Sequence, residues 1–230
     1  MLNPALTARI QELARDRTGG AAELAVLAAG ILEDASPGEL KAAAEAVMRA
    51  QPAMAPVYNA AQAALAGRLP EFLARLRRSA VRVAEKAAGL VAAKTVLTHS
   101  YSSTVVQALR YAPPARLLCT ESLPGGEGRR TASLLQGEVI PDAAVYSALA
   151  GVEVAVVGAD AVTPTFVVNK LGTALVALAA GARGVPVWVL CGSEKFVPAA
   201  WSPHLGELFE ATPRAWFTGV LDDEGFADLL

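Results

Sequence analysis

The sequence predicts an α/β protein in which a helical N-terminal domain, residues 1–92, precedes a Rossmann-like α/β domain with a parallel sheet, residues 93–230. The first ninety residues are rich in Ala, Leu, Arg and Glu, and their apolar residues recur at helical spacing. From Lys94 onward, short β-branched or apolar runs alternate with helical segments, which is typical of βαβ units. The run Val154–Val157 is apolar throughout, as expected for a strand buried on both faces of a parallel sheet.

The N-terminal helices are separated by recognisable turns. Thr18-Gly19-Gly20 separates the first helix from the second. The motif Ser36-Pro37-Gly38-Glu39 is a capping box that opens a third helix, which extends to about Arg49. A long helix is then expected from Pro70 to about Ala92.

Four runs in the second half are the strongest strand candidates: Thr95–Thr98, Arg116–Cys119, Val152–Val157 and Val185–Leu190. Two weaker candidates are Glu138–Ile140 and Ala215–Thr218. Crossovers between parallel strands are right-handed, and ligands bind beyond the carboxyl ends of the strands in such sheets. Polar residues that follow these strands are therefore the candidate site residues.

Composition excludes several classes of function. The chain has 230 residues, 53% of them apolar, and a net charge of −2, so we expect a folded protein with no nucleic-acid or membrane partner. Cys119 and Cys191 are far apart and there are only two His, so we expect no metal site and no cofactor. Both thiols follow apolar runs and are expected to be buried and inert. The N-terminus lacks a signal-peptide pattern and no apolar stretch is long enough to span a membrane, which predicts a cytoplasmic protein.

The first polar loop, Thr98–Thr104, follows a strand and precedes a helix. The hydroxyl groups of Ser100, Ser102 and Ser103, or backbone N–H groups at the helix start, could bind an anion such as phosphate. The alternative is simple helix capping by Ser102 or Ser103.

The second polar loop, Thr120–Thr131, also follows a strand. Its glycines let the backbone approach a ligand, and its two arginines, Arg129 and Arg130, can bind phosphate in a bidentate manner. Glu121 is a further candidate ligand residue. The alternative is a flexible surface loop with charges at a helix start.

The third polar segment carries the strongest candidates. A strand ends at Gly158, Asp160 follows it, and Asn169 and Lys170 come in a turn that opens a helix over Ala174–Ala182. Asp160 could act as a general acid or base if burial raises its pKa, and Lys170 could neutralise phosphate. The alternatives are a turn cap and a solvated helix start. Since all three loops follow strands, we expect them to form one shared cleft.

A weaker candidate lies among the N-terminal helices. Arg17 with Gly19-Gly20 could fold over the cleft as a phosphate clamp, although a plain turn between helices explains the same residues.

Together these motifs resemble one family, which contains the α, β and δ regulatory subunits of translation initiation factor 2B, methylthioribose-1-phosphate isomerase and ribose-1,5-bisphosphate isomerase. The resemblance covers most of the chain. Its most specific part is Gly158-Ala159-Asp160 followed by the segment 169–173 (NKLGT), supported by Val96–Ser103, by Thr120–Pro124 with Gly128-Arg129, and by Arg17–Ala25. The resemblance implies a helical domain on a Rossmann-like domain, dimers formed through the latter, and a phosphorylated small molecule as ligand.

In the isomerases of this family, a cysteine and an aspartate move a proton between C1 and C2 of a sugar phosphorylated on its anomeric oxygen. Asp160 matches the aspartate, whereas Ser100 stands at the position of the cysteine. A thiol can exchange a proton near neutral pH, but a serine hydroxyl needs an added base to do so. Leu123 and Gly19 stand where the isomerases carry ligand-binding arginines, and Arg17 could substitute imperfectly for the second.

The resemblance therefore supports two interpretations. In the preferred one, the chain is an initiation-factor-2B-subunit-like protein that binds a phosphorylated sugar or nucleotide without isomerase chemistry, through Arg17, Gly20, Ser102, Ser103, Glu121, Arg129, Asn169 and Lys170. In the alternative, it is an aldose–ketose isomerase that uses Asp160 and Ser100. A homodimer is expected in both cases, and a protein partner remains an option.

Overall fold

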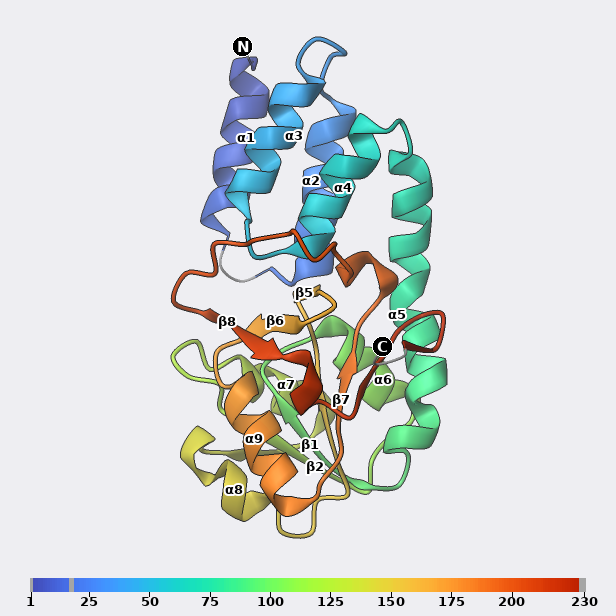
Figure 1. The fold of residues 1–230 in the computed structure, drawn as a ribbon, viewed down its shortest axis with the longest axis vertical. Helices are drawn as coiled ribbons and strands as arrows, with labels where there is room; N and C mark the ends of the chain where they lie inside the picture. Colours follow the sequence, from blue (N-terminus) through green and yellow to red (C-terminus); the bar gives the residue numbers. More distant parts are fainter. Residues whose placement is uncertain (1, 17–18, 228–230) are drawn as a thin grey trace.

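The computed structural model describes residues 2–16 and 19–227, so Arg17 lies outside the described part of the chain. Five helices form the N-terminal half of that part: α1 (Pro4–Arg15), α2 (Ala21–Glu33), α3 (Leu40–Ala50), α4 (Ala55–Leu65) and α5 (Leu69–Val91). The expected third helix begins at Leu40, after a turn in which Ser36 accepts the backbone N–H of Leu40. In Figure 1 these helices occupy one end of the molecule and the sheet occupies the other.

The main sheet has seven strands in the order β10-β9-β7-β4-β1-β2-β3. All neighbouring pairs are parallel except β10 with β9. The strands are β1 (Thr95–His99), β2 (Arg116–Thr120), β3 (Glu138–Ile140), β4 (Val154–Val157), β7 (Val187–Leu190), β9 (Gly219–Leu221) and β10 (Phe226–Ala227). The predicted fold class, helices followed by a Rossmann-like parallel sheet, is confirmed.

Helices cover both faces of this sheet. They are α6 (Ser103–Tyr111), α7 (Glu127–Leu135), α8 (Val145–Ala148) and α9 (Thr173–Arg183). Alternate residues of β4 point to opposite faces: Val154 and Val156 join the cluster beneath α5 and α6, whereas Ala155 and Val157 join the cluster beneath α8 and α9. This double burial explains why β4 is a continuous apolar run.

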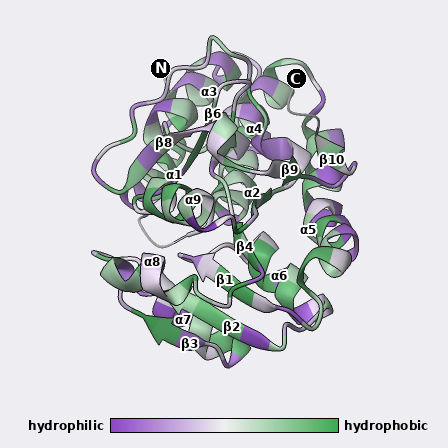
Figure 2. Cartoon of the chain, turned by 60° about the horizontal axis from the view of Figure 1, so that its bottom comes forward, coloured by the Kyte–Doolittle hydropathy of each residue, from purple (hydrophilic) through white to green (hydrophobic). Residues whose placement is uncertain are grey.

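Helix α5 belongs to two hydrophobic clusters. Leu69 and Phe72, near its start, pack with α1–α4, whereas Val83 and Val91 pack on the sheet beside α6. Figure 1 shows α5 running alongside both ends of the molecule, and in Figure 2 it alternates between hydrophobic and hydrophilic residues, as an amphipathic helix does. The helix therefore links the two halves, and the domain division at residues 92 and 93 stays a prediction.

A second, antiparallel sheet of three strands was not anticipated. It consists of β5 (Ala161–Val162), β6 (Phe166–Lys170) and β8 (Phe209–Pro213), in the order β5-β6-β8. Asn169 and Lys170 are thus the last residues of a strand rather than part of the turn that opens a helix. The strand forms because Val167 and Val168 are fully buried and pair with β5 and β8.

The weak strand candidate Ala215–Thr218 is wrong. A short 3-10 helix, η3 (Arg214–Trp216), occupies its start, and strand pairing begins at Gly219. Gly219 lies under the ring of Trp188, and a Cβ atom there would come within 2.5 Å of that ring. The chain can therefore pair closely with β7 only from Gly219 onward.

Candidate functional site

Five of the predicted site residues line a cavity of about 100 Å³ where the N-terminal helices meet the carboxyl ends of the strands: Gly20, Ser100, Asp160, Asn169 and Lys170. The helical side adds Asp16, Leu24, Gln51 and Met54, and the chain at the start of β8 adds Leu208 and Phe209. Polar and apolar side chains thus line the cavity on both sides. This is the position at which open α/β sheets bind ligands.

The other predicted residues lie elsewhere. Ser102 caps α6, since its hydroxyl accepts the N–H of Val105 at 3.4 Å, and Ser103 is the first residue of that helix. Glu121 and Arg129 form an ion pair and neither lines the cavity. All three polar loops therefore contribute residues to the cavity, although Glu121 and Arg129 of the second loop do not.

Ser100 is buried and its backbone is fixed from two sides. Its N–H donates to the hydroxyl of Ser122 at 2.7 Å, and its carbonyl accepts the hydroxyl of Thr131 at 2.9 Å. Ser122 is held in turn by Asp142, which accepts its backbone N–H at 2.8 Å. These bonds hold Ser100 at φ 63°, a left-handed conformation that is uncommon for residues other than glycine and often occurs at functional sites.

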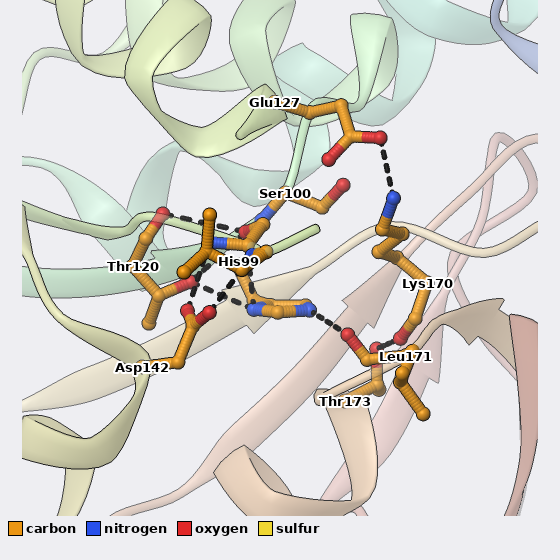
Figure 3. Close-up of polar contacts among 10 residues, drawn as sticks. His99, Ser100, Thr120, Glu127, Asp142, Lys170, Leu171 and Thr173 are labelled. Carbon is orange, nitrogen blue, oxygen red and sulfur yellow. Dashed lines mark hydrogen bonds and ion pairs between the residues drawn. The ribbon is translucent and has the colours of Figure 1, made fainter. Parts of the chain in front are cut away.

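His99, just before Ser100, is a structural residue (Figure 3). Its Nε2 donates to the carbonyl of Leu171 at 2.9 Å, so Nδ1 carries no proton and accepts from the hydroxyl of Thr120 at 2.7 Å. Burial lowers the pKa of His99, which keeps the ring neutral. With both nitrogens occupied, His99 does not activate Ser100, and no other described residue hydrogen-bonds the Ser100 hydroxyl.

Asp160 follows β4 and is fixed through its backbone. Its N–H donates to Val168 of β6 at 2.8 Å, and its carbonyl accepts the N–H of Ala55 at 2.9 Å. Burial raises the pKa of the Asp160 carboxyl group, while the positive charges of Lys195 and Lys170 oppose the rise. The resulting carboxyl group is suited to exchanging a proton closer to neutral pH than an exposed aspartate.

Lys170 is almost fully buried and forms an ion pair with Glu127, the first residue of α7 (Figure 3). Its carbonyl accepts the hydroxyl of Thr173, and that hydroxyl also accepts the amide of Asn169 at 3.0 Å. The second carboxylate oxygen of Glu127 is buried and has no hydrogen-bond partner. The Glu127–Lys170 pair therefore presents both a positive group and a free acceptor at the cavity.

Several contributors to this region were not identified from the sequence. Glu127 and Tyr101 line the cavity, and Ser122 and Asp142 support Ser100. Arg130, one of the two arginines considered as phosphate ligands in the second loop, lines the cavity as well. Glu127 stands directly before Gly128 in the glycine-rich loop, which is the one signal that could have identified it.

Both cysteines are buried, and burial raises the pKa of Cys119 to about 12.

Comparison with known proteins identifies the family. The model of the initiation factor 2 subunit family matches residues 8–212. A translation initiation factor eIF-2B subunit 2-like protein of Pyrococcus horikoshii is 31% identical, with 94% of each chain covered. This chain belongs to the initiation factor 2 subunit family.

Relatives of this chain carry names that denote different functions. The ribose 1,5-bisphosphate isomerase of Haloterrigena turkmenica is 30% identical over 96% of this chain and 78% of its own length. The crystal structure of the Pyrococcus horikoshii translation initiation factor eIF-2B superposes with a TM-score of 0.88 at 29% identity, covering 98% of both chains. The 5-methylthioribose 1-phosphate isomerase of the same organism has a TM-score of 0.67 at 16% identity, which shows a shared fold. The predicted resemblance is confirmed.

Two further findings concern the described residues alone. None of their helices has the length and apolar character needed to cross a membrane. No group of three or more His, Cys, Asp and Glu side chains among them is placed to hold a metal ion.

Proposed function

We propose that this chain is an initiation-factor-2B-subunit-like protein that binds a phosphorylated sugar or nucleotide in the cavity, without isomerase chemistry. The observation that carries the proposal is Ser100, which lines the same cavity as Asp160 and has no base on its hydroxyl among the described residues. The polar floor formed by Asn169, Lys170 and Glu127 supplies both donors and acceptors for such a ligand.

The chemistry of Ser100 argues against isomerisation. In the cysteine–aspartate arrangement that the resemblance implies, moving a proton between two sugar carbons uses one group that donates and one that accepts near neutral pH. Asp160 can serve as one of them, but a serine hydroxyl without a base cannot serve as the other. Losing a well-matched acid costs about 10²–10⁴-fold in rate.

The size of the cavity bears on how a ligand enters. At about 100 Å³ it is smaller than typical ligand sites, which measure roughly 300–1,000 Å³. Leu208 and Phe209 form part of its wall and belong to the segment that crosses between the helices and the sheet (Figure 1). A phosphorylated sugar would therefore displace this segment or extend into the mouth of the cavity.

The alternative function is a sugar-phosphate isomerase of the ribose-1,5-bisphosphate or methylthioribose-1-phosphate type. The raised pKa of Asp160 favours it, because that is the property expected of a catalytic acid or base. The likeness to ribose 1,5-bisphosphate isomerases along the chain is compatible with it as well.

One experiment separates the two functions. Phosphosugars and nucleotides are screened by thermal shift, and ribose 1,5-bisphosphate and methylthioribose 1-phosphate are followed by NMR with wild type, Ser100→Cys and Asp160→Asn. Our proposal expects stabilisation by at least one compound, no turnover by wild type and partial turnover by Ser100→Cys. Robust turnover by wild type that is abolished in Asp160→Asn would establish the isomerase instead. Absence of both binding and turnover would remove the ligand-binding proposal.

We also propose that the chain forms a homodimer through α9. Leu175 and Leu178 of α9 and Leu171 just before it lie at helical spacing and are 47%, 52% and 42% exposed. A contiguous apolar face of this kind usually marks an interaction surface.

A further inference from the structure

Arg130 lies at the cavity in an unusual setting. Its guanidinium carbon is 3.9 Å from the centroid of the Tyr101 ring, and both residues line the cavity. Arg129 precedes it on α7 but is turned by about 100°, as successive helical residues are, and pairs with Glu121 instead. The two neighbouring arginines therefore have different surroundings.

Apart from Arg130, carboxyl groups outnumber basic groups among the described residues that line the cavity. Lys170 is paired with Glu127, and Asp16 and Asp160 add two further carboxyl groups. A phosphate dianion placed between these groups would meet three carboxyl groups and one lysine. Arg130 is exposed and, in the part of the chain that the structure describes, forms no ion pair.

Stacking on the Tyr101 ring restricts the conformational freedom of the Arg130 side chain before any ligand binds. A guanidinium stacked over an aromatic face loses little further freedom on binding, and its in-plane N–H groups stay available. These N–H groups match two phosphate oxygens in a bidentate arrangement. Tyr101 itself is adjacent to Ser100, so the stack is anchored to the backbone that Ser122 and Thr131 fix.

We propose that Arg130, held by Tyr101, is the residue that binds the phosphate group of the ligand at the mouth of the cavity, while the Glu127–Lys170 pair binds uncharged hydroxyl groups inside. This inference rests on the proposed function, since it assigns the phosphate within the same site. The ligand class is a phosphorylated polyol with its hydroxyl-bearing carbons directed toward Asp160.

The test compares two adjacent arginines. Calorimetric titration with ribose 1,5-bisphosphate is performed on wild type, Arg130→Ala, Arg130→Lys and the matched control Arg129→Ala. Since hydrogen bonds to charged groups contribute about 1.5–3 kcal/mol, Arg130→Ala should weaken binding about ten- to a hundredfold. Arg130→Lys should recover part of the loss, and Arg129→Ala should stay within about twofold of wild type. Both positions are on an exposed helix surface, and thermal unfolding checks that the variants are folded.

Two further readouts distinguish phosphate binding from a structural role. The affinity of wild type should fall as the salt concentration rises, and that of Arg130→Ala should fall less. Tyr101→Phe should bind as wild type does, and Tyr101→Leu should bind more weakly. Unchanged binding by Arg130→Ala, or an equal loss in Arg129→Ala, would overturn the inference while leaving the proposed function intact. If folded wild type binds neither ribose 1,5-bisphosphate nor any other phosphosugar or nucleotide of the thermal-shift panel, the proposed function fails and this inference fails with it.

Discussion

The backbone N–H of Ala55, the first residue of α4, donates a 2.9 Å hydrogen bond to the carbonyl oxygen of Asp160. Asp160, the candidate acid or base of the cavity, is therefore hydrogen-bonded directly to the N-terminal helices. Asn59 on the same helix donates to the carbonyls of Glu194 and Phe196 at 2.8 and 2.9 Å. These contacts and the shared helix α5 couple the two halves of the molecule.

We expect the whole chain to unfold in a single cooperative transition. Trp188, Trp201 and Trp216 all lie in the second half of the chain, so their fluorescence reports on that half, whereas far-ultraviolet circular dichroism is weighted toward the helices. The two signals should give the same denaturation midpoint. Asn59→Ala should lower the free energy of unfolding by about 1–3 kcal/mol, and with it the midpoint, because two carbonyls lose their donor. Separate midpoints in wild type would show that the halves unfold independently.

Asp160→Asn should stabilise the fold. Burial raises the pKa of Asp160 in the folded state, so ionisation costs folding free energy once the pH exceeds the unfolded-state value of about 4. The amide carries no such cost. The variant should therefore melt higher than wild type near neutral pH, and the difference should shrink toward zero at about pH 4. Glu33→Gln, an exposed acid on α2, should show no comparable gain, and a lower melting temperature for Asp160→Asn at neutral pH would contradict the prediction.

Gly128→Ala should destabilise the protein. A Cβ atom at Gly128 would lie 1.6 Å from the carbonyl oxygen of Thr120, so the start of α7 must move away from β2. We expect a cost of about 1–3 kcal/mol or more in urea denaturation. Gly89→Ala is the control, since nothing lies within 4 Å of its Cβ position in α5, and it should stabilise by up to about 1 kcal/mol. Equal effects at the two glycines would argue against the close packing of α7 on β2.

Leu175→Glu should convert the proposed homodimer to a monomer. The substitution places a charge in the centre of the exposed leucine face of α9, where burial against a second copy would cost free energy. Light scattering at micromolar concentration measures the mass directly. Leu65→Glu, at a 44% exposed position on α4, should leave the dimer intact. A monomeric wild type would rule out the proposed interface.

Strands β1, β2, β4 and β7 of the main sheet could be predicted because each is a short apolar run between helical segments, and the weak candidate Glu138–Ile140 coincides with β3. Strands β9 and β10 were not predicted. Strand β6 could not, since its pairing with β8 joins residues about forty positions apart in the sequence. The same limit applies at the site. That Arg130 rather than Arg129 lines the cavity depends on the rotation of α7, and the bond from Ser122 to Ser100 depends on how two loops meet.

Helix α5 also decides how the protein can be divided for experiment. A fragment that starts at residue 93 would lack Val83, Ala87 and Val91, and the sheet beside α6 would expose the apolar residues that they cover. Such a fragment should aggregate during expression, whatever the stability of its strands. A fragment that starts at Leu69, the first residue of α5, would keep this cover. It would, however, expose Phe72 and Leu76, which pack against the N-terminal helices in the whole chain. Neither of these two fragments would therefore have all of its apolar surface covered.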